Sequence, residues 1–121
     1  WRILQHNKAD DFVISSGKQI YVKKFLNETL NILKIKYKWY IKKNSEKVIV
    51  TENHKKFKNI IKNKVIVSTS KKYFRPLEVS NLLGDSSKAK KILRWKPKIK
   101  LKDMIDEMIK EDFKNLNIHE K

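Results

Sequence analysis

The chain has 121 residues, of which 30 are Lys or Arg and 13 are Asp or Glu, so its formal net charge is +17. Because cysteine is absent, disulfide bonds and thiolate metal sites are excluded. No apolar run reaches the ~18 residues of a membrane span. Lysines occur in every segment rather than beside one recognition motif, which disfavours specific nucleic-acid binding. The length indicates one small domain, or a piece of a larger one.

The first part of the chain combines a strand-like run with a helix-like pattern. Residues 11–15 are predicted to form a short buried strand, because the apolar residues Phe12, Val13 and Ile14 are contiguous. Apolar side chains then recur every three or four positions from Val22 to Leu33, which predicts an amphipathic helix ending near Lys34. Its expected N-cap residue is Tyr21, which is a poor choice because Ser, Thr, Asp and Asn are the side chains that cap well.

Three more strands are expected in the middle of the chain. Residues 35–41 alternate between apolar and polar side chains, and residues 47–51 and 64–68 each contain a short β-branched run. We interpret residues 52–63 as a loop or insertion whose lysines form a solvated surface. The strand at 11–15, the following helix and a later strand make a β-α-β order that favours a parallel pair. The expected fold class is therefore α/β, with a short mixed or parallel sheet and three to four helices.

The segment from Tyr73 to Lys90 carries the candidate functional residues. Arg75 precedes Pro76, and proline fits the first position of a helix, so Glu78 would fall in its first turn. A guanidinium beside a helix N-terminus can bind a diphosphate. A carboxylate three residues further on can accept two hydrogen bonds from a ribose diol. The alternative is an ordinary surface ion pair without a ligand.

Two more helices are expected after this segment. Gly84 is expected to end the first helix in the left-handed conformation, and Asp85 is expected to cap a second helix that runs to Leu93. A final helix is predicted to begin near Leu101. Apolar residues at helical spacing form its expected buried stripe: Met104, Ile105, Met108, Ile109, Phe113 and Leu116.

Four motifs follow one another in a specific order. They are Asp11-Phe-Val-Ile-Ser-Ser-Gly, Tyr73-Phe-Arg-Pro-x-Glu-Val, Leu83-Gly-Asp-x-Ser-Lys-Ala-Lys and Leu93-x-Trp-Lys-Pro. Together they resemble the C-terminal part of the GDP-mannose 4,6-dehydratases, a family in the extended short-chain dehydrogenase/reductase (SDR) superfamily. The resemblance covers nearly the whole chain. It implies that Arg75 contacts the diphosphate of GDP and that Glu78 contacts the GDP ribose.

The resemblance also implies what the complete enzyme does. It is expected to be a cytoplasmic, homo-oligomeric hydro-lyase that uses NADP to convert GDP-mannose into GDP-4-dehydro-6-deoxy-mannose. Residues 1–121 would be its C-terminal nucleotide-sugar-binding lobe, with the N-terminal Rossmann domain outside the chain. The same Arg-x-x-Glu pattern would suit another nucleotide-sugar dehydratase, epimerase or reductase. A basic nucleic-acid-binding protein is the alternative from a different class.

Residues for catalysis or metal binding are not suggested by the sequence. The only glycines are Gly17 and Gly84, so a glycine-rich dinucleotide loop cannot form. No tyrosine is followed four residues later by lysine, so the superfamily's catalytic Tyr-x-x-x-Lys is absent. The three histidines (His6, His54 and His119) lack metal-ligand spacing and are expected to face solvent. We therefore expect no catalysis from this chain alone.

The backbone at position 94 is a separate point. The family resembled here usually has glycine at this position, and this chain has Arg94. Arg94 is expected to be strained if the position requires a positive φ.

Overall fold

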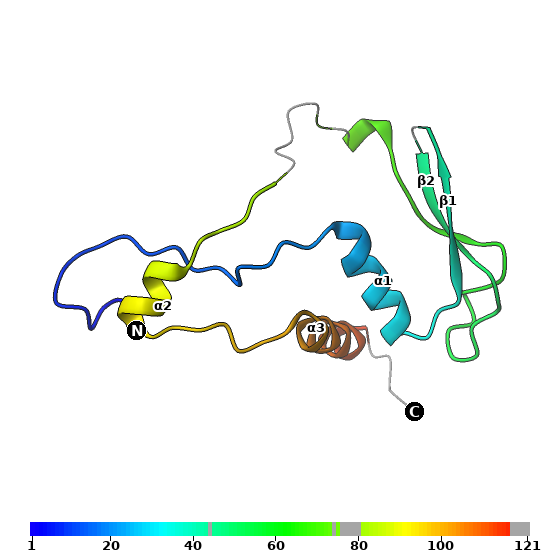
Figure 1. The fold of residues 1–121 in the computed structure, drawn as a ribbon. Coiled ribbons are helices and arrows are strands. Elements are labelled where there is room, and N and C mark those ends of the chain that lie inside the picture. Colours follow the sequence, from blue (N-terminus) through cyan, green and yellow to red (C-terminus); the bar gives the residue numbers. More distant parts are fainter. Residues whose placement is uncertain (44, 74, 76–80, 117–121) are drawn as a thin grey trace.

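The computed structural model describes residues 1–43, 45–73, 75 and 81–116. Its elements are, in chain order, α1 (Val22–Ile32), β1 (Tyr37–Lys42), β2 (Ser45–Val50), β3 (Val65–Ser68), the 3-10 turn η1 (Lys71–Tyr73), α2 (Ser87–Leu93) and α3 (Leu101–Asn115). In Figure 1 the sheet lies at one end beside α1, and α3 lies below α1. Helix α2 lies at the other end, close to the N-terminal segment.

The three strands form one antiparallel sheet in the order β1-β2-β3. Trp39 of β1 lies opposite Val48 of β2, which in turn lies opposite Val67 of β3. The α/β class is confirmed, and the three described helices agree with the expected three to four, but the described strands show no parallel pairing. The expected parallel pair needed residues 11–15 as a strand, and these residues join no strand in the described part of the chain. Strands β1 and β2 are joined only by residues 43–44, which is too short a connection for a parallel crossover.

Residues 11–15 were expected to form a strand, and this expectation is wrong. In the described part of the chain these residues are not paired with any strand. Instead they run beside the segment that precedes α2, where the Ser15 hydroxyl donates a hydrogen bond to the Gly84 carbonyl over 2.6 Å. Val13 and Ile14 remain half exposed. The apolar residues therefore indicated that this segment packs against another part of the chain. They could not show whether a neighbouring strand is available to pair with it.

Helix α1 covers one face of the sheet. Val48 and Val50, two positions apart on β2, point to the same face and are fully buried with Leu30 of α1. The Trp39 indole N–H donates to Asn27 Oδ1 over 2.9 Å, which fixes β1 against the helix. The predicted helix is confirmed, and its N-cap Tyr21 makes no side-chain capping hydrogen bond. Packing on the sheet, rather than capping, therefore stabilises α1.

Helix α3 packs against α1 through part of its apolar stripe. The predicted start at Leu101 is confirmed. Ile105 is 1% exposed and Ile109 is also buried, but Met104 is 41% exposed and Met108 is exposed as well. The apolar stripe is therefore only partly covered, because α1 is the one described helix that packs against it.

Helix α2 is held by the N-terminal segment. Seven residues are too few for a helix that is stable by itself in water. The Arg2 guanidinium donates to the carbonyl oxygens of Leu93, over 2.9 Å, and of Arg94, so it satisfies the exposed carbonyl end of the helix. Lys88 forms an ion pair with Asp10. The N-terminal segment and α2 therefore depend on each other.

The backbone at the end of α2 is strained. Arg94 is the C-cap residue and adopts φ 50° and ψ 31°, the left-handed conformation. A side chain with a Cβ atom is disfavoured there by roughly 1 kcal/mol. We expect Arg94→Gly to raise the free energy of unfolding by about 1 kcal/mol, measured by urea denaturation. The control Lys91→Gly, in the helical part of α2, is expected to lower the free energy of unfolding by a similar amount. A lower free energy of unfolding in Arg94→Gly as well would contradict the prediction.

Candidate functional site

Arg75 lies on an exposed basic turn that follows the sheet. Strand β3 ends at Ser68, η1 follows, and Arg75 comes two residues after η1 with its side chain in solvent. Tyr73 is 76% exposed, and the Lys72 ammonium lies 5.8 Å from the centre of its ring. With Lys71 and Lys72, Arg75 makes three cations within five residues, and residues 65–75 contain no acidic side chain. This turn suits an anionic ligand, since residues 65–75 carry three cationic side chains and no carboxylate.

The second predicted site residue, Glu78, lies outside the described residues, as does Pro76 at the expected helix start. The end of that expected helix is described, and residues 81–83 are not helical. The structure therefore locates Arg75 but gives no distance between the two side chains. Their pairing one helical turn apart remains a prediction.

Gly84 has a different role from the one expected. It does not adopt the left-handed conformation, and no described helix ends there, so the expected C-cap is wrong. A Cβ atom at Gly84 would lie 2.8 Å from Ser15 Cβ and 3.4 Å from Val13 Cγ1. Glycine is needed because two backbone segments approach closely. This contact attaches the chain returning from the basic turn to the N-terminal segment.

The close contact at Gly84 leads to a testable expectation. We expect Gly84→Ala to lower the free energy of unfolding by about 1 to 3 kcal/mol, because the added methyl group overlaps Ser15. Adding Ser15→Gly removes the overlapping atoms and is expected to restore part of this loss. A double-mutant cycle by urea denaturation measures the coupling. Additive effects of the two substitutions on the free energy of unfolding would show that overlap with Ser15 does not cause the loss of stability in Gly84→Ala.

The N-cap residue of α2 is Ser86 and not the expected Asp85, and the Ser86 side chain makes no capping hydrogen bond. Asp85, one position earlier, contacts the first residue of the helix. Its carboxylate accepts hydrogen bonds from the Ser87 hydroxyl and, over 2.9 Å, from the Ser87 backbone N–H. These two bonds, the hydroxyl first, lower the pKa of the Asp85 carboxyl below its ordinary value of 3.8. These two hydrogen bonds to the charged carboxylate are therefore present at neutral pH and are lost only as the pH falls through that lowered pKa. Ser86, the residue between them, is buried.

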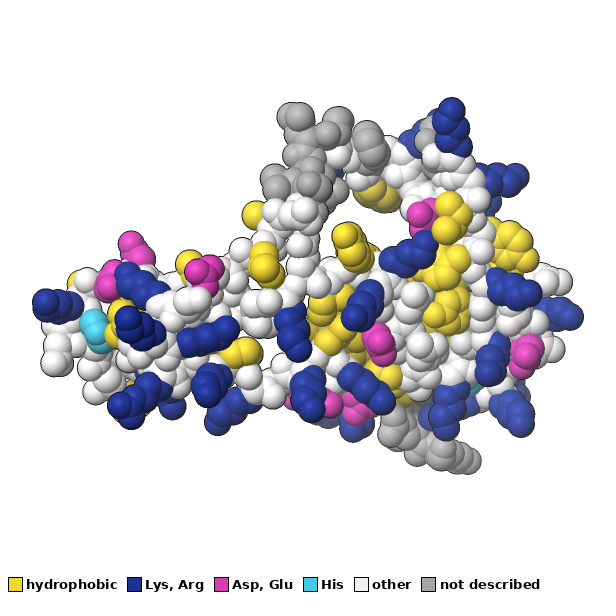
Figure 2. All heavy atoms as spheres, viewed as in Figure 1, with side chains coloured by type: hydrophobic (Ala, Val, Ile, Leu, Met, Phe, Trp, Pro, Cys, Tyr) yellow, Lys and Arg dark blue, Asp and Glu magenta, His cyan; other side chains and the backbone are white. Residues whose placement is uncertain are grey.

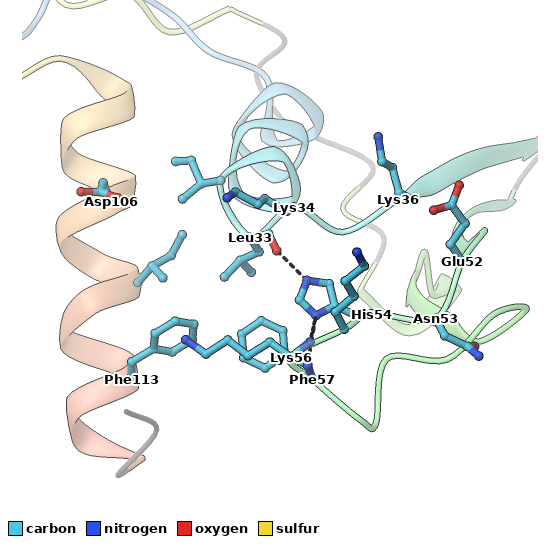
Figure 3. Close-up of a pocket in the computed structure, with 13 residues that line it drawn as sticks. Leu33, Lys34, Lys36, Glu52, Asn53, His54, Lys56, Phe57, Asp106 and Phe113 are labelled. Carbon is cyan, nitrogen blue, oxygen red and sulfur yellow. Dashed lines mark hydrogen bonds between the residues drawn. The ribbon is translucent and has the colours of Figure 1, made fainter. Parts of the chain in front are cut away.

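A separate pocket of about 610 Å³ lies between the C-terminal end of α1, the connection from β2 to β3, and α3 (Figure 3). His54 lies in this pocket, half-buried, so its expected exposure to solvent is wrong. Its Nδ1 atom accepts hydrogen bonds from the backbone N–H groups of Lys56 and Phe57, at 3.1 and 3.0 Å. Its Nε2 atom therefore carries the proton and donates to the Leu33 carbonyl over 2.9 Å. Sequence alone could not reveal this, because Leu33 is 21 positions away.

The described ranges contain neither a candidate metal site nor a candidate membrane span. Among those residues, no three His, Asp or Glu side chains are grouped so that they could hold a metal ion. The same residues include no helix with both the length and the apolar character needed to cross a bilayer.

Fold and site together define a small α/β lobe with an exposed basic turn after a sheet strand. Residues 1–108 match the family described as GDP-mannose 4,6 dehydratase, and the chain belongs to this family. It is 39% identical over 112 residues to GDP-mannose 4,6 dehydratase 2 of Caenorhabditis elegans, covering 93% of this chain and 27% of that protein. It is 36% identical over 127 residues to GDP-mannose 4,6-dehydratase of Vibrio cholerae serotype O1, covering 98% and 32%. The chain thus spans less than a third of the length of either relative.

Proposed function

We propose that this chain is the nucleotide-sugar-binding lobe of a GDP-mannose 4,6-dehydratase. The complete enzyme would convert GDP-mannose into GDP-4-dehydro-6-deoxy-mannose, a loss of one water. The observation that carries the proposal is family membership over residues 1–108. A cytoplasmic location and self-association of the complete enzyme are part of the same proposal.

In this proposal the basic turn binds the nucleotide end of the substrate. Arg75 donates two parallel hydrogen bonds to diphosphate oxygens, for which a planar guanidinium is better suited than an ammonium group. Glu78 accepts hydrogen bonds from the ribose hydroxyls. Lys71 and Lys72 strengthen the local positive potential without forming a fixed fork. Binding energy from these remote groups orients the sugar for chemistry at another place.

The residues of this chain do not fit NADP. A dinucleotide loop needs several glycines between a strand and a helix, and the chain has two glycines, one of which is in contact with Ser15. The described strands are antiparallel, unlike the parallel sheet of a dinucleotide fold. We therefore assign NADP binding and the catalytic groups to a part of the enzyme outside this chain. The role of this lobe is to bind and orient GDP-mannose.

Substrate turnover by the complete gene product tests the proposed function. With GDP-mannose and NADP, mass spectrometry is expected to show a product that has lost one water. The same assay with UDP-glucose and dTDP-glucose separates this function from that of other nucleotide-sugar enzymes. Turnover of one of these sugars in place of GDP-mannose would reject the assignment. Tight binding of nucleic acid that persists at high salt, without any turnover, would favour the nucleic-acid-binding alternative.

A further inference from the structure

The pocket around His54 lies away from the basic turn and has no role in the proposed function. Its walls come from the C-terminal end of α1, the connection between β2 and β3, and α3 (Figure 3). Its volume of about 610 Å³ lies within the range of ~300 to 1,000 Å³ typical of small-molecule sites. The side chains that line it combine aromatic rings with an excess of positive charge.

The aromatic part of the pocket is a connected set of three rings. His54 stacks on Phe57 with ring centres 4.7 Å apart and planes inclined by 22°. Phe57 in turn lies 5.6 Å from Phe113 of α3. Ile109, one turn before Phe113 on the same helix, adds an aliphatic side chain to the wall. This wall offers apolar contacts to a flat ring.

The charged part of the pocket is positive. Four lysines line it, at positions 34, 36, 55 and 56, against Glu52 and Asp106. Asp106 is already paired, because its Oδ2 atom lies 2.7 Å from the Lys110 ammonium. Figure 3 shows Lys34 and Lys56 extending towards α3, whereas Glu52 lies on the side of the pocket remote from α3, beside Lys36. The ammonium of Lys56 lies 5.8 Å from the centre of the Phe57 ring and 5.4 Å from that of Phe113. A cation therefore lies directly beside the apolar wall.

The floor of the pocket is fixed by hydrogen bonds. Both nitrogens of His54 are engaged, so the ring cannot turn without losing a bond to Leu33, Lys56 or Phe57. The carbonyl end of α1 would repel an anion if its oxygens were free. Several are engaged, since the Leu30 carbonyl accepts from the Ile35 N–H and the Leu33 carbonyl accepts from His54. The His54 ring and the stacked Phe57 ring are thus held in place before a ligand arrives, which lowers the entropic cost of binding.

From this arrangement we propose that the pocket binds a small organic phosphate that carries an aromatic ring. The ring lies against Phe57 and Phe113, and the phosphate interacts with the ammonium groups of Lys34 and Lys56. The site is distinct from the basic turn at Arg75 and does not depend on the proposed dehydratase function. A neutral aromatic compound would lose the ionic contacts, and a phosphate without a ring would lose the apolar ones.

Binding of 1-naphthyl phosphate to the full chain tests this proposal. We expect the ligand to shift the NMR signals of the His54 ring and the Ile109 methyl groups, with a dissociation constant on the order of 0.1 mM. Inorganic phosphate and 1-naphthol, each lacking one half of the probe, are expected to bind at least tenfold more weakly. Equal shifts from inorganic phosphate alone would overturn the proposal, because the ring would then contribute nothing.

Matched lysine variants separate a specific site from the general positive charge of the chain. Lys56→Ala and Lys34→Ala are each expected to weaken 1-naphthyl phosphate binding by about five- to tenfold. The control Lys58→Ala, in the same connection but not in the pocket wall, is expected to change it by less than twofold. Equal weakening by Lys56→Ala and Lys58→Ala would overturn the proposal. Arg75→Ala is expected to leave this binding unchanged, so failure here and failure of the proposed GDP site are distinguishable.

Discussion

Replacing Arg75 with alanine is expected to weaken GDP binding by the complete enzyme by roughly 10- to 150-fold. A hydrogen bond to a charged group contributes about 1.5 to 3 kcal/mol, and each ~1.4 kcal/mol corresponds to a tenfold change in affinity. The fold is expected to survive, because the Arg75 side chain is exposed and belongs to no helix or strand. Isothermal titration calorimetry with GDP measures the effect, and circular dichroism checks the fold.

Two further variants show whether geometry or charge is responsible. Arg75→Lys keeps the charge but lacks the planar fork, so we expect an intermediate loss of affinity. Lys72→Ala removes a neighbouring cation to which no contact with the ligand is assigned. This variant is expected to weaken GDP binding by less than threefold at physiological salt, where exposed charges are screened. Unchanged GDP affinity in Arg75→Ala would reject the role proposed for this residue. Equal losses in Arg75→Ala and Lys72→Ala would indicate general electrostatic attraction only.

Ile105→Ala is expected to have the largest effect on stability, a loss of about 3 kcal/mol in the free energy of unfolding. Ile105 is 1% exposed on the side of α3 that packs against α1, so truncation leaves a cavity that neighbouring side chains cannot fully close. A loss of this size is a large fraction of the stability of a small domain. Urea denaturation followed by circular dichroism measures it.

The neighbouring residue provides a matched control on the same helix. Met104 is apolar and lies one position earlier, but it is 41% exposed, so we expect Met104→Ala to cost less than about 1 kcal/mol. The comparison isolates burial from helix propensity, since both variants place alanine in the first half of α3. A loss as large as that of Ile105→Ala would mean that Met104 is covered in solution, contrary to the structure.

Local patterns in the sequence predicted the helices and the sheet strands well. The helical spacing from Val22 to Leu33 and the start at Leu101 both correspond to observed helices, α1 and α3. The strain suspected at Arg94 is also confirmed, because that residue has the positive φ that the family's glycine would accommodate. These features depend on residues close together in the chain, where side-chain type and spacing carry the information.

Features that depend on distant segments were not predictable in the same way. Gly84 is followed by a good capping residue, so a helix end was the natural interpretation, yet its role is contact with Ser15, 69 positions away. The run at 11–15 has strand character but no strand partner among the described residues. The tautomer of His54 likewise depends on a helix end that the sequence does not place beside it. In each case, the missing information is which remote group occupies the neighbouring space.

The β1 edge, one of the two unpaired edges of the described sheet, has a consequence for behaviour at high concentration. Strand β1 pairs with β2 on one side, and within the described ranges no strand pairs with its other side. Such an edge can template the backbone of another molecule and begin a fibril. Exposed Lys38 and Lys42 lie along this edge, so a second copy that docked there would bring ammonium groups together. The lysines therefore oppose aggregation through this edge by electrostatic repulsion between molecules. This repulsion is expected to weaken as the salt concentration rises, because salt shortens the range over which charges repel each other.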